Sequence, residues 1–167
     1  MTLYGKIDFK DNDYFETKGF WENNIIHLNL KAPKKYIYTK SVPTITKQLE
    51  KFLPGIFTSQ CFNKNNFHFK KECENTELGH LFEHVLLEYL CLEKISKGEK
   101  RYSFKGLTTW NWRIEEKGKF NIRIESLYAN EKDMLKTAFI SSLHLFEEIL
   151  DGNITAEQAI PRPLGSH

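Results

Sequence analysis

The chain has 167 residues, of which 40% are hydrophobic and 28% charged, so it is long enough for one domain with a buried core and extensive disorder is not expected. Its 24 basic and 22 acidic residues leave a formal net charge of +2, which argues against a nucleic-acid partner. Because no segment approaches the roughly 20 apolar residues that cross a bilayer and the first ten residues do not resemble a signal peptide, we expect a cytoplasmic protein without membrane contact.

The first half of the chain predicts two strands and one helix. Residues 3–10 and 24–31 alternate apolar and polar positions, as half-buried strands do, with a turn region between them. Residues 44–53 carry apolar side chains at helical spacing, and the Pro-Gly pair that follows favours the end of a helix. Residues 57–75 are polar and irregular and are expected to form a loop.

The second half of the chain predicts two helices and two strands, in the order helix 77–95, strand 107–114, strand 119–128 and helix 131–150. This order of elements indicates an α+β fold, with helices packed on an antiparallel or mixed sheet. We expect one compact domain over residues 1–160, while residues 161–167 resemble a disordered or artificial tail. The three cysteines, Cys61, Cys73 and Cys91, have no CxxC spacing, so reduced thiols are expected and a cysteine-based zinc site is not.

The sequence His80-Leu-Phe-Glu83-His84 lies in the predicted helix 77–95, which Asn75 or Thr76 can cap. His80 and His84 are one helical turn apart, so both imidazoles can reach one metal ion, and Glu83 lies on the same side. His-x-x-Glu-His is the inverted form of a zinc-peptidase helix motif, in which the carboxylate acts as general base on water. The alternative is a chance pair of surface histidines.

A catalytic zinc ion needs a third protein ligand. We select Glu125, because it lies downstream on the polar face of the predicted strand 119–128. Glu88, one turn after His84, is the main competitor. Less favoured alternatives are Glu115, Glu116, His27 and His144.

Four collinear segments carry a family resemblance: Phe52-Leu-Pro-Gly-Ile56 with Cys61 after it, Thr76-Glu-Leu-Gly-His80-Leu-Phe-Glu83-His84-Val-Leu-Leu-Glu88, Gly106-Leu-Thr108, and Phe120-Asn-Ile-Arg-Ile-Glu125. Together they resemble the N-terminal domain of cyanophycin synthetase. The whole synthetase is the enzyme that polymerises aspartate and arginine. The resemblance extends from about residue 40 to residue 155. Thr109 and Ser126 depart from the family pattern; neither is an expected ligand, but either change can alter substrate contacts.

The resemblance implies a zinc-dependent, endopeptidase-like hydrolase that cuts cyanophycin or a related polymer into short chains that prime synthesis. It implies Glu83 as the catalytic base and His80, His84 and Glu125 as metal ligands, although other divalent transition metals suit the same ligands. Expected substrate contacts are Glu88, Arg101, Thr108 and Arg123. The alternatives are a non-catalytic domain that docks the polymer and a purely structural domain.

Expected partners are the polymer, the ligase domains of a synthetase and, because the family forms oligomers, a second copy of the chain. The sequence contains no Gly-x-x-x-x-Gly-Lys-Ser/Thr phosphate loop, so we do not expect this chain alone to run ATP-dependent polymerisation.

Overall fold

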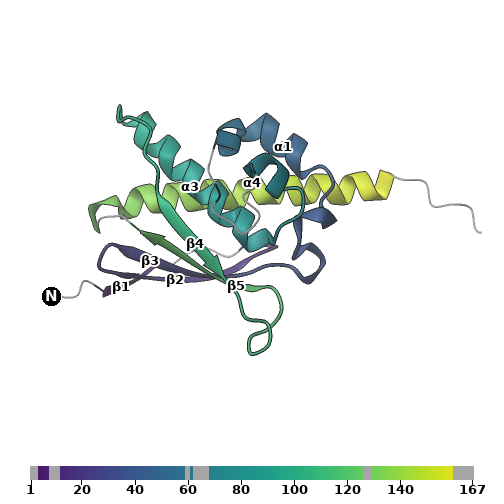
Figure 1. Cartoon of the computed structure of the whole chain (residues 1–167), viewed down its shortest axis with the longest axis horizontal. Coiled ribbons are helices and arrows are strands. Elements are labelled where there is room, and N and C mark those ends of the chain that lie inside the picture. Colours follow the sequence, from purple (N-terminus) through teal and green to yellow (C-terminus); the bar gives the residue numbers. More distant parts are fainter. Residues whose placement is uncertain (1–3, 8–11, 59–60, 62–67, 126–128, 160–167) are drawn as a thin grey trace, which may run out of the picture.

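The computed structural model describes residues 4–7, 12–58, 61, 68–125 and 129–159 of the chain. A five-stranded antiparallel sheet has the strand order β1-β2-β3-β5-β4, and helices cover one of its faces (Figure 1). This arrangement confirms the predicted α+β fold with an antiparallel sheet. The strands are β1 Tyr4–Ile7, β2 Glu16–Glu22, β3 Ile25–Lys31, β4 Lys105–Thr109 and β5 Lys119–Glu125, and the α-helices are α1 Ile45–Phe52, α2 Phe69–Glu72, α3 Leu78–Ser96 and α4 Lys132–Ala159.

The core lies between the sheet and helices α3 and α4. Alternate residues of β3 and β5 are buried because strand side chains point by turns to opposite faces, and every second one meets the helices. Aromatic rings fill the space behind them, with Phe82 of α3 stacked on Phe146 of α4 at a centroid distance of 5.3 Å. Burial of these apolar groups fixes α3 against the sheet.

One strand was not predicted, and one predicted strand has the wrong bounds. Strand β2 was missed because its inward positions include Thr17 and Gly19, which hide the alternation of apolar residues. The strand predicted at 107–114 begins earlier and ends at Thr109. The aromatic residues after it lie in the β4–β5 connection, where the rings of Trp110 and Trp112 pack against Phe120 instead of continuing the strand.

The helix predictions are confirmed in place, with differences at their ends. The N-cap of α3 is Glu77, one residue later than expected. Helix α4 continues to Ala159, well beyond the predicted end. A short helix, α2, and a 3₁₀ turn at Pro54–Thr58 occupy parts of the region expected to be a loop. The predicted tail, the middle of that loop and the ends of two predicted strands lie outside the described residues.

No helix among the described residues is long and apolar enough to span a membrane.

Candidate functional site

The N-terminal end of α3, which carries the motif, is tied to the preceding chain by hydrogen bonds. The Thr39 amide donates to the Thr76 carbonyl at 2.8 Å, and the Thr76 amide donates to Oγ1 of Thr39 at 2.8 Å. Tyr38 and Glu77 form an isolated antiparallel bridge. These bonds anchor the first turn of α3, and with it His80.

His80 and His84 converge as the motif predicts, and the structure adds Cys61 to them. The Nε2 atoms of the two histidines are 3.2 Å apart, and Sγ of Cys61 lies 3.4 Å from Nε2 of His80. One ligand atom from each residue fits within 4.8 Å of the others. Ligands that share a tetrahedral zinc ion lie about 3.3–3.6 Å apart, given Zn–N and Zn–S bonds of about 2.0 and 2.3 Å. The group therefore has donor types that zinc accepts, and the two separations that involve His80 are close to this spacing.

Cys61 was not predicted as a ligand, because the three cysteines have no CxxC spacing. It follows the Leu53-Pro54-Gly55 segment, one of the segments that carry the family resemblance. The thiol comes from the chain between η3 (Pro54–Thr58) and α2, so the fold brings it to α3 over a long sequence separation. Nothing in a helical spacing rule could have joined these residues.

Neighbouring side chains fix the two imidazoles. Nδ1 of His80 lies 2.9 Å from Oγ1 of Thr76, and the ring of His84 stacks on Phe69 at 3.9 Å between centroids. Burial lowers the pKa of both histidines, to about 3 for His84, where the nearby His80 contributes as well. Both rings are therefore neutral at physiological pH, which is the form that binds metal.

Glu83 is buried between α3 and the inner face of β4, with 5% of its surface exposed. Oγ1 of Thr108 donates a hydrogen bond to its Oε2 at 2.5 Å. Gly106 permits this close approach, since a Cβ there would lie 2.6 Å from Oε1 of Glu83. Burial raises the pKa of Glu83 to about 7, although the Thr108 hydrogen bond opposes the shift. The carboxyl group is thus poised to exchange a proton near neutral pH.

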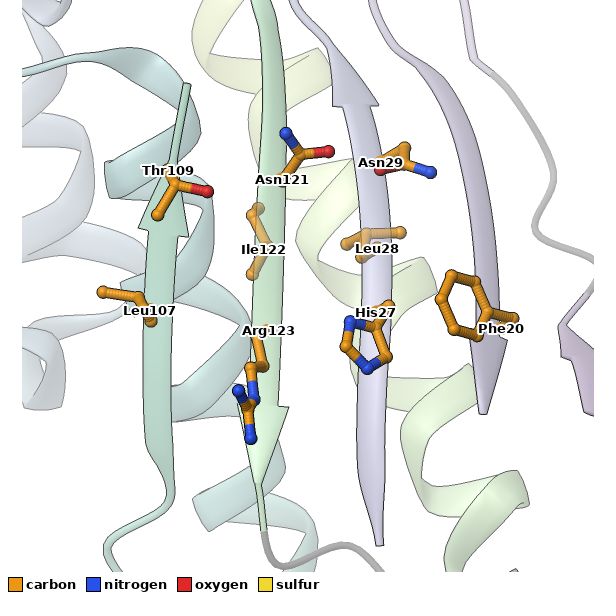
Figure 2. A pocket seen from close by; sticks show the side chains of 9 residues that line it. All are labelled: Phe20, His27, Leu28, Asn29, Leu107, Thr109, Asn121, Ile122 and Arg123. Carbon is orange, nitrogen blue, oxygen red and sulfur yellow. The ribbon is translucent and has the colours of Figure 1, made fainter. Parts of the chain in front are cut away.

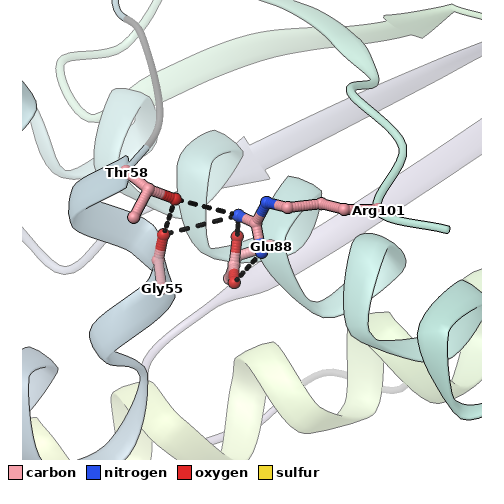
Figure 3. A network of polar contacts seen from close by, with 4 residues as sticks. All are labelled: Gly55, Thr58, Glu88 and Arg101. Atoms are coloured by element: carbon pink, nitrogen blue, oxygen red, sulfur yellow. Dashed lines mark hydrogen bonds and ion pairs between the residues drawn. The ribbon is translucent and has the colours of Figure 1, made fainter.

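The predicted substrate contacts Glu88 and Arg101 bind each other (Figure 3). Glu88 is 3% exposed, and its Oε2 accepts a 2.7 Å hydrogen bond from Nη2 of Arg101. The same guanidinium donates to Oγ1 of Thr58 at 3.1 Å and to the carbonyl of Gly55 at 3.5 Å. Glu88 therefore serves to hold Arg101, whose side chain is half-exposed at the edge of the cleft.

Glu125, the predicted third ligand, is at the end of β5 and pairs with Arg123 at 3.2 Å. Both side chains are partly exposed and line the same cleft as the histidines. Among the described residues, however, Glu125 is not one of the three whose ligand atoms converge. Its role as a ligand stays a prediction, and Cys61 becomes the structural candidate for that position.

The cleft that holds these groups has a volume of about 1250 Å³. Helix α3 supplies the histidines and Glu83, β4 supplies four consecutive residues, and Thr58 and Cys61 also line the cleft. Trp110 lines the cleft just beyond β4 and is 37% exposed. A cleft of this size is larger than most small-molecule sites, which occupy about 300–1,000 Å³.

A smaller hollow of about 330 Å³ lies on the open face of the sheet, away from the helices (Figure 2). Its wall includes His27 and Phe20, whose rings stack at 4.6 Å, together with Arg123. His27, a minor candidate ligand from the sequence, thus points to this face.

Comparison with known proteins gives one family. A family model described as the cyanophycin synthase-like N-terminal domain matches residues 25–144, which include β3, β4, β5 and α3. No curated protein matches the chain.

Proposed function

The chain belongs to the cyanophycin synthase-like N-terminal domain family, and from this we propose that it is a zinc-dependent hydrolase acting on cyanophycin or a related polymer of aspartate and arginine. Internal cleavage would yield short chains that prime further synthesis by the ligase domains of a synthetase. The observation that carries the proposal is the convergence of Cys61, His80 and His84 beside the buried Glu83.

Cys61, His80 and His84 would hold the metal. Three protein ligands are typical of catalytic zinc sites, because a fourth position stays free for water or substrate. When bound, zinc would act as a Lewis acid that polarises the substrate carbonyl and lowers the pKa of water. The thiol, the neutral imidazoles and the Thr76 hydroxyl that fixes His80 match what such a site needs.

Glu83 is the proposed general base. Its ionised carboxylate takes a proton from the attacking water and then delivers it to the nitrogen that leaves when the amide bond breaks. A pKa of about 7 suits both steps, because the group gives and accepts a proton with little cost at neutral pH. The Thr108 hydroxyl holds one carboxylate oxygen and leaves the other to carry the proton.

The cleft favours a polymer over a small molecule. Its large volume is lined by charges of both signs, including Glu72, Glu77, Arg101 and Lys105. A chain that carries guanidinium and carboxylate groups complements such a wall.

The test uses the purified chain incubated with cyanophycin, with zinc or with a chelator. We expect the polymer to shorten with zinc and to stay intact with the chelator. Glu83→Gln should slow cleavage about 10²- to 10⁴-fold, because it removes the base. Glu93→Gln, on the same helix and outside the cleft lining, should cleave normally. If the zinc-loaded chain binds the polymer and cuts nothing, the domain is a docking module instead.

A further inference from the structure

Among the residues that the structure describes, no strand pairs with the outer edge of β4, and this edge borders the cleft. Lys105, Gly106, Leu107 and Thr108 all line it, although neighbouring side chains of a strand point to opposite faces. Four consecutive residues can border one cleft only if the edge of the strand itself forms part of the wall. β4 ends the strand order, with β5 as its neighbour, and Figure 2 shows Leu107 on the open face at this end of the sheet.

This edge carries main-chain groups that the sheet does not use. In an antiparallel pair, every second residue directs its N–H and C=O to the partner strand, and the residues between direct theirs away. Among the described residues, no main-chain hydrogen bond outside the regular elements involves Lys105–Thr109. The outer side of β4 therefore presents a row of donors and acceptors at strand spacing.

The same edge passes the proposed catalytic base. Thr108 bonds Glu83 directly, and Gly106 has no side chain to keep Glu83 away from the strand. A chain extended along the five residues of β4 would span about 16 Å, at about 3.3 Å per residue. Its middle would lie beside Glu83.

We propose that the substrate's main chain binds as an added antiparallel or parallel strand on the free edge of β4. The inference rests on the proposed function, because the occupant is the polyamide main chain of that polymer. An extended polyamide repeats N–H and C=O groups at the spacing that β4 offers, whereas a compact ligand does not. Side chains of an added strand alternate in direction, so those on one side face the helices and those on the other lie on the face of the sheet that exposes Lys105.

Amide hydrogen exchange tests the proposal directly. The full chain carrying Glu83→Gln, which is expected to slow cleavage strongly, is mixed with a short synthetic aspartate–arginine oligomer and followed by NMR. We expect exchange to slow at least about tenfold at alternate amides of β4, because these become hydrogen-bonded to the oligomer. The other edge strand, β1, is the internal control and should exchange at its original rate.

Modified oligomers give a second readout. Methylation of every second main-chain nitrogen of the oligomer leaves one row of N–H groups intact. Its Kd should therefore stay within about threefold of the Kd of the unmodified oligomer. Methylation of all main-chain nitrogens should abolish binding. A loss of affinity that simply grows with the number of methyl groups would overturn strand addition.

The outcomes separate this inference from the proposed function. If the oligomer fails to bind, or binds without slowing exchange in β4, strand addition is wrong, whether or not the wild-type chain cleaves the polymer. If β4 is protected and the wild-type chain cuts nothing, strand addition stands and the hydrolase proposal falls.

Discussion

Glu83 differs from the exposed acids of the chain because its surroundings set its protonation. Burial disfavours the charged carboxylate and raises its pKa to about 7, while the Thr108 hydroxyl favours the charged form and limits the rise. Two residues of β4 therefore set the surroundings of the Glu83 side chain: Gly106 leaves space for it, and Thr108 donates a hydrogen bond to it. The protonation of Glu83 thus depends on a strand that the motif does not contain.

Thr108→Val tests this dependence. Without the hydroxyl, ionised Glu83 loses a stabilising hydrogen bond, so its pKa should rise by about one unit. Because the ionised carboxylate is the proposed base, kcat/KM should decrease as the pH drops below the pKa of Glu83. In Thr108→Val this decrease should begin at a higher pH. Thr109→Val changes the neighbouring residue on the other face of β4 and should leave the pH profile in place. An unchanged profile in Thr108→Val would contradict the role given to this hydrogen bond.

Measuring the zinc affinity of variants will show whether Cys61 or Glu125 is the third metal ligand. Cys61→Ser should weaken zinc binding at least about 100-fold, since even partners outside the ligand set cost about 10- to 100-fold. Cys91→Ser alters another cysteine that lines the cleft but does not join the group, and should bind zinc normally. Glu125→Gln completes the series under reducing conditions. A large loss in this variant, with Cys61→Ser unaffected, would restore Glu125 as the ligand.

At the level of elements, the sequence predicts those helices and strands whose apolar residues repeat at a regular spacing. The alternation of β3 and β5 and the apolar spacing of α3 and α4 were sufficient to predict these elements and the α+β fold. β2 was missed because Thr17 and Gly19 occupy its inward positions. His80, Glu83 and His84 were found because one helix carries them. Cys61 and the pairing of Glu88 with Arg101 depend on contacts between distant segments, which periodicity does not encode.

The packing of α3 against β5 has a sharp steric requirement. A Cβ at Gly79 would lie 2.2 Å from the ring of Phe120, whereas one at Gly152 of α4 would meet nothing closer than 3.8 Å. Alanine favours a helix over glycine by about 1 kcal/mol at both positions. Gly152→Ala should therefore raise the free energy of unfolding by about 0.5–1 kcal/mol.

Gly79→Ala should have the opposite sign and lower the free energy of unfolding by about 1–3 kcal/mol, because overpacking outweighs helix propensity. Denaturant unfolding of both variants measures the difference. Equal stabilisation by the two alanines would show that α3 can move away from the sheet at no cost.

At the scale of the whole molecule, the proposed metal group joins segments that secondary structure leaves separate. Cys61 belongs to the chain before α2, and the histidines belong to α3. An ion bound to all three residues would hold the cleft wall to the helix beneath it. Folding and metal binding are then expected to be linked.

Thermal unfolding of the metal-free chain with and without zinc measures this linkage. At a free zinc concentration of 100 times Kd, binding should add about 2.7 kcal/mol of stability. For a domain of this size, that corresponds to a rise in Tm of about 5–10 °C. Magnesium, which prefers oxygen ligands, should leave Tm unchanged. If zinc does not raise Tm, the three residues do not form a metal site in the folded chain.

The guanidinium of Arg101 binds Glu88 of α3 and also Thr58 and the Gly55 carbonyl, so it links its own segment and the Gly55–Thr58 turn to α3. These links set the width of the cleft before any ligand binds. The conformational entropy of ordering these walls is then lost during folding and not at each encounter with substrate. If the ligand is the proposed polymer, a cleft of constant width allows each of its identical repeats to bind at the same cost.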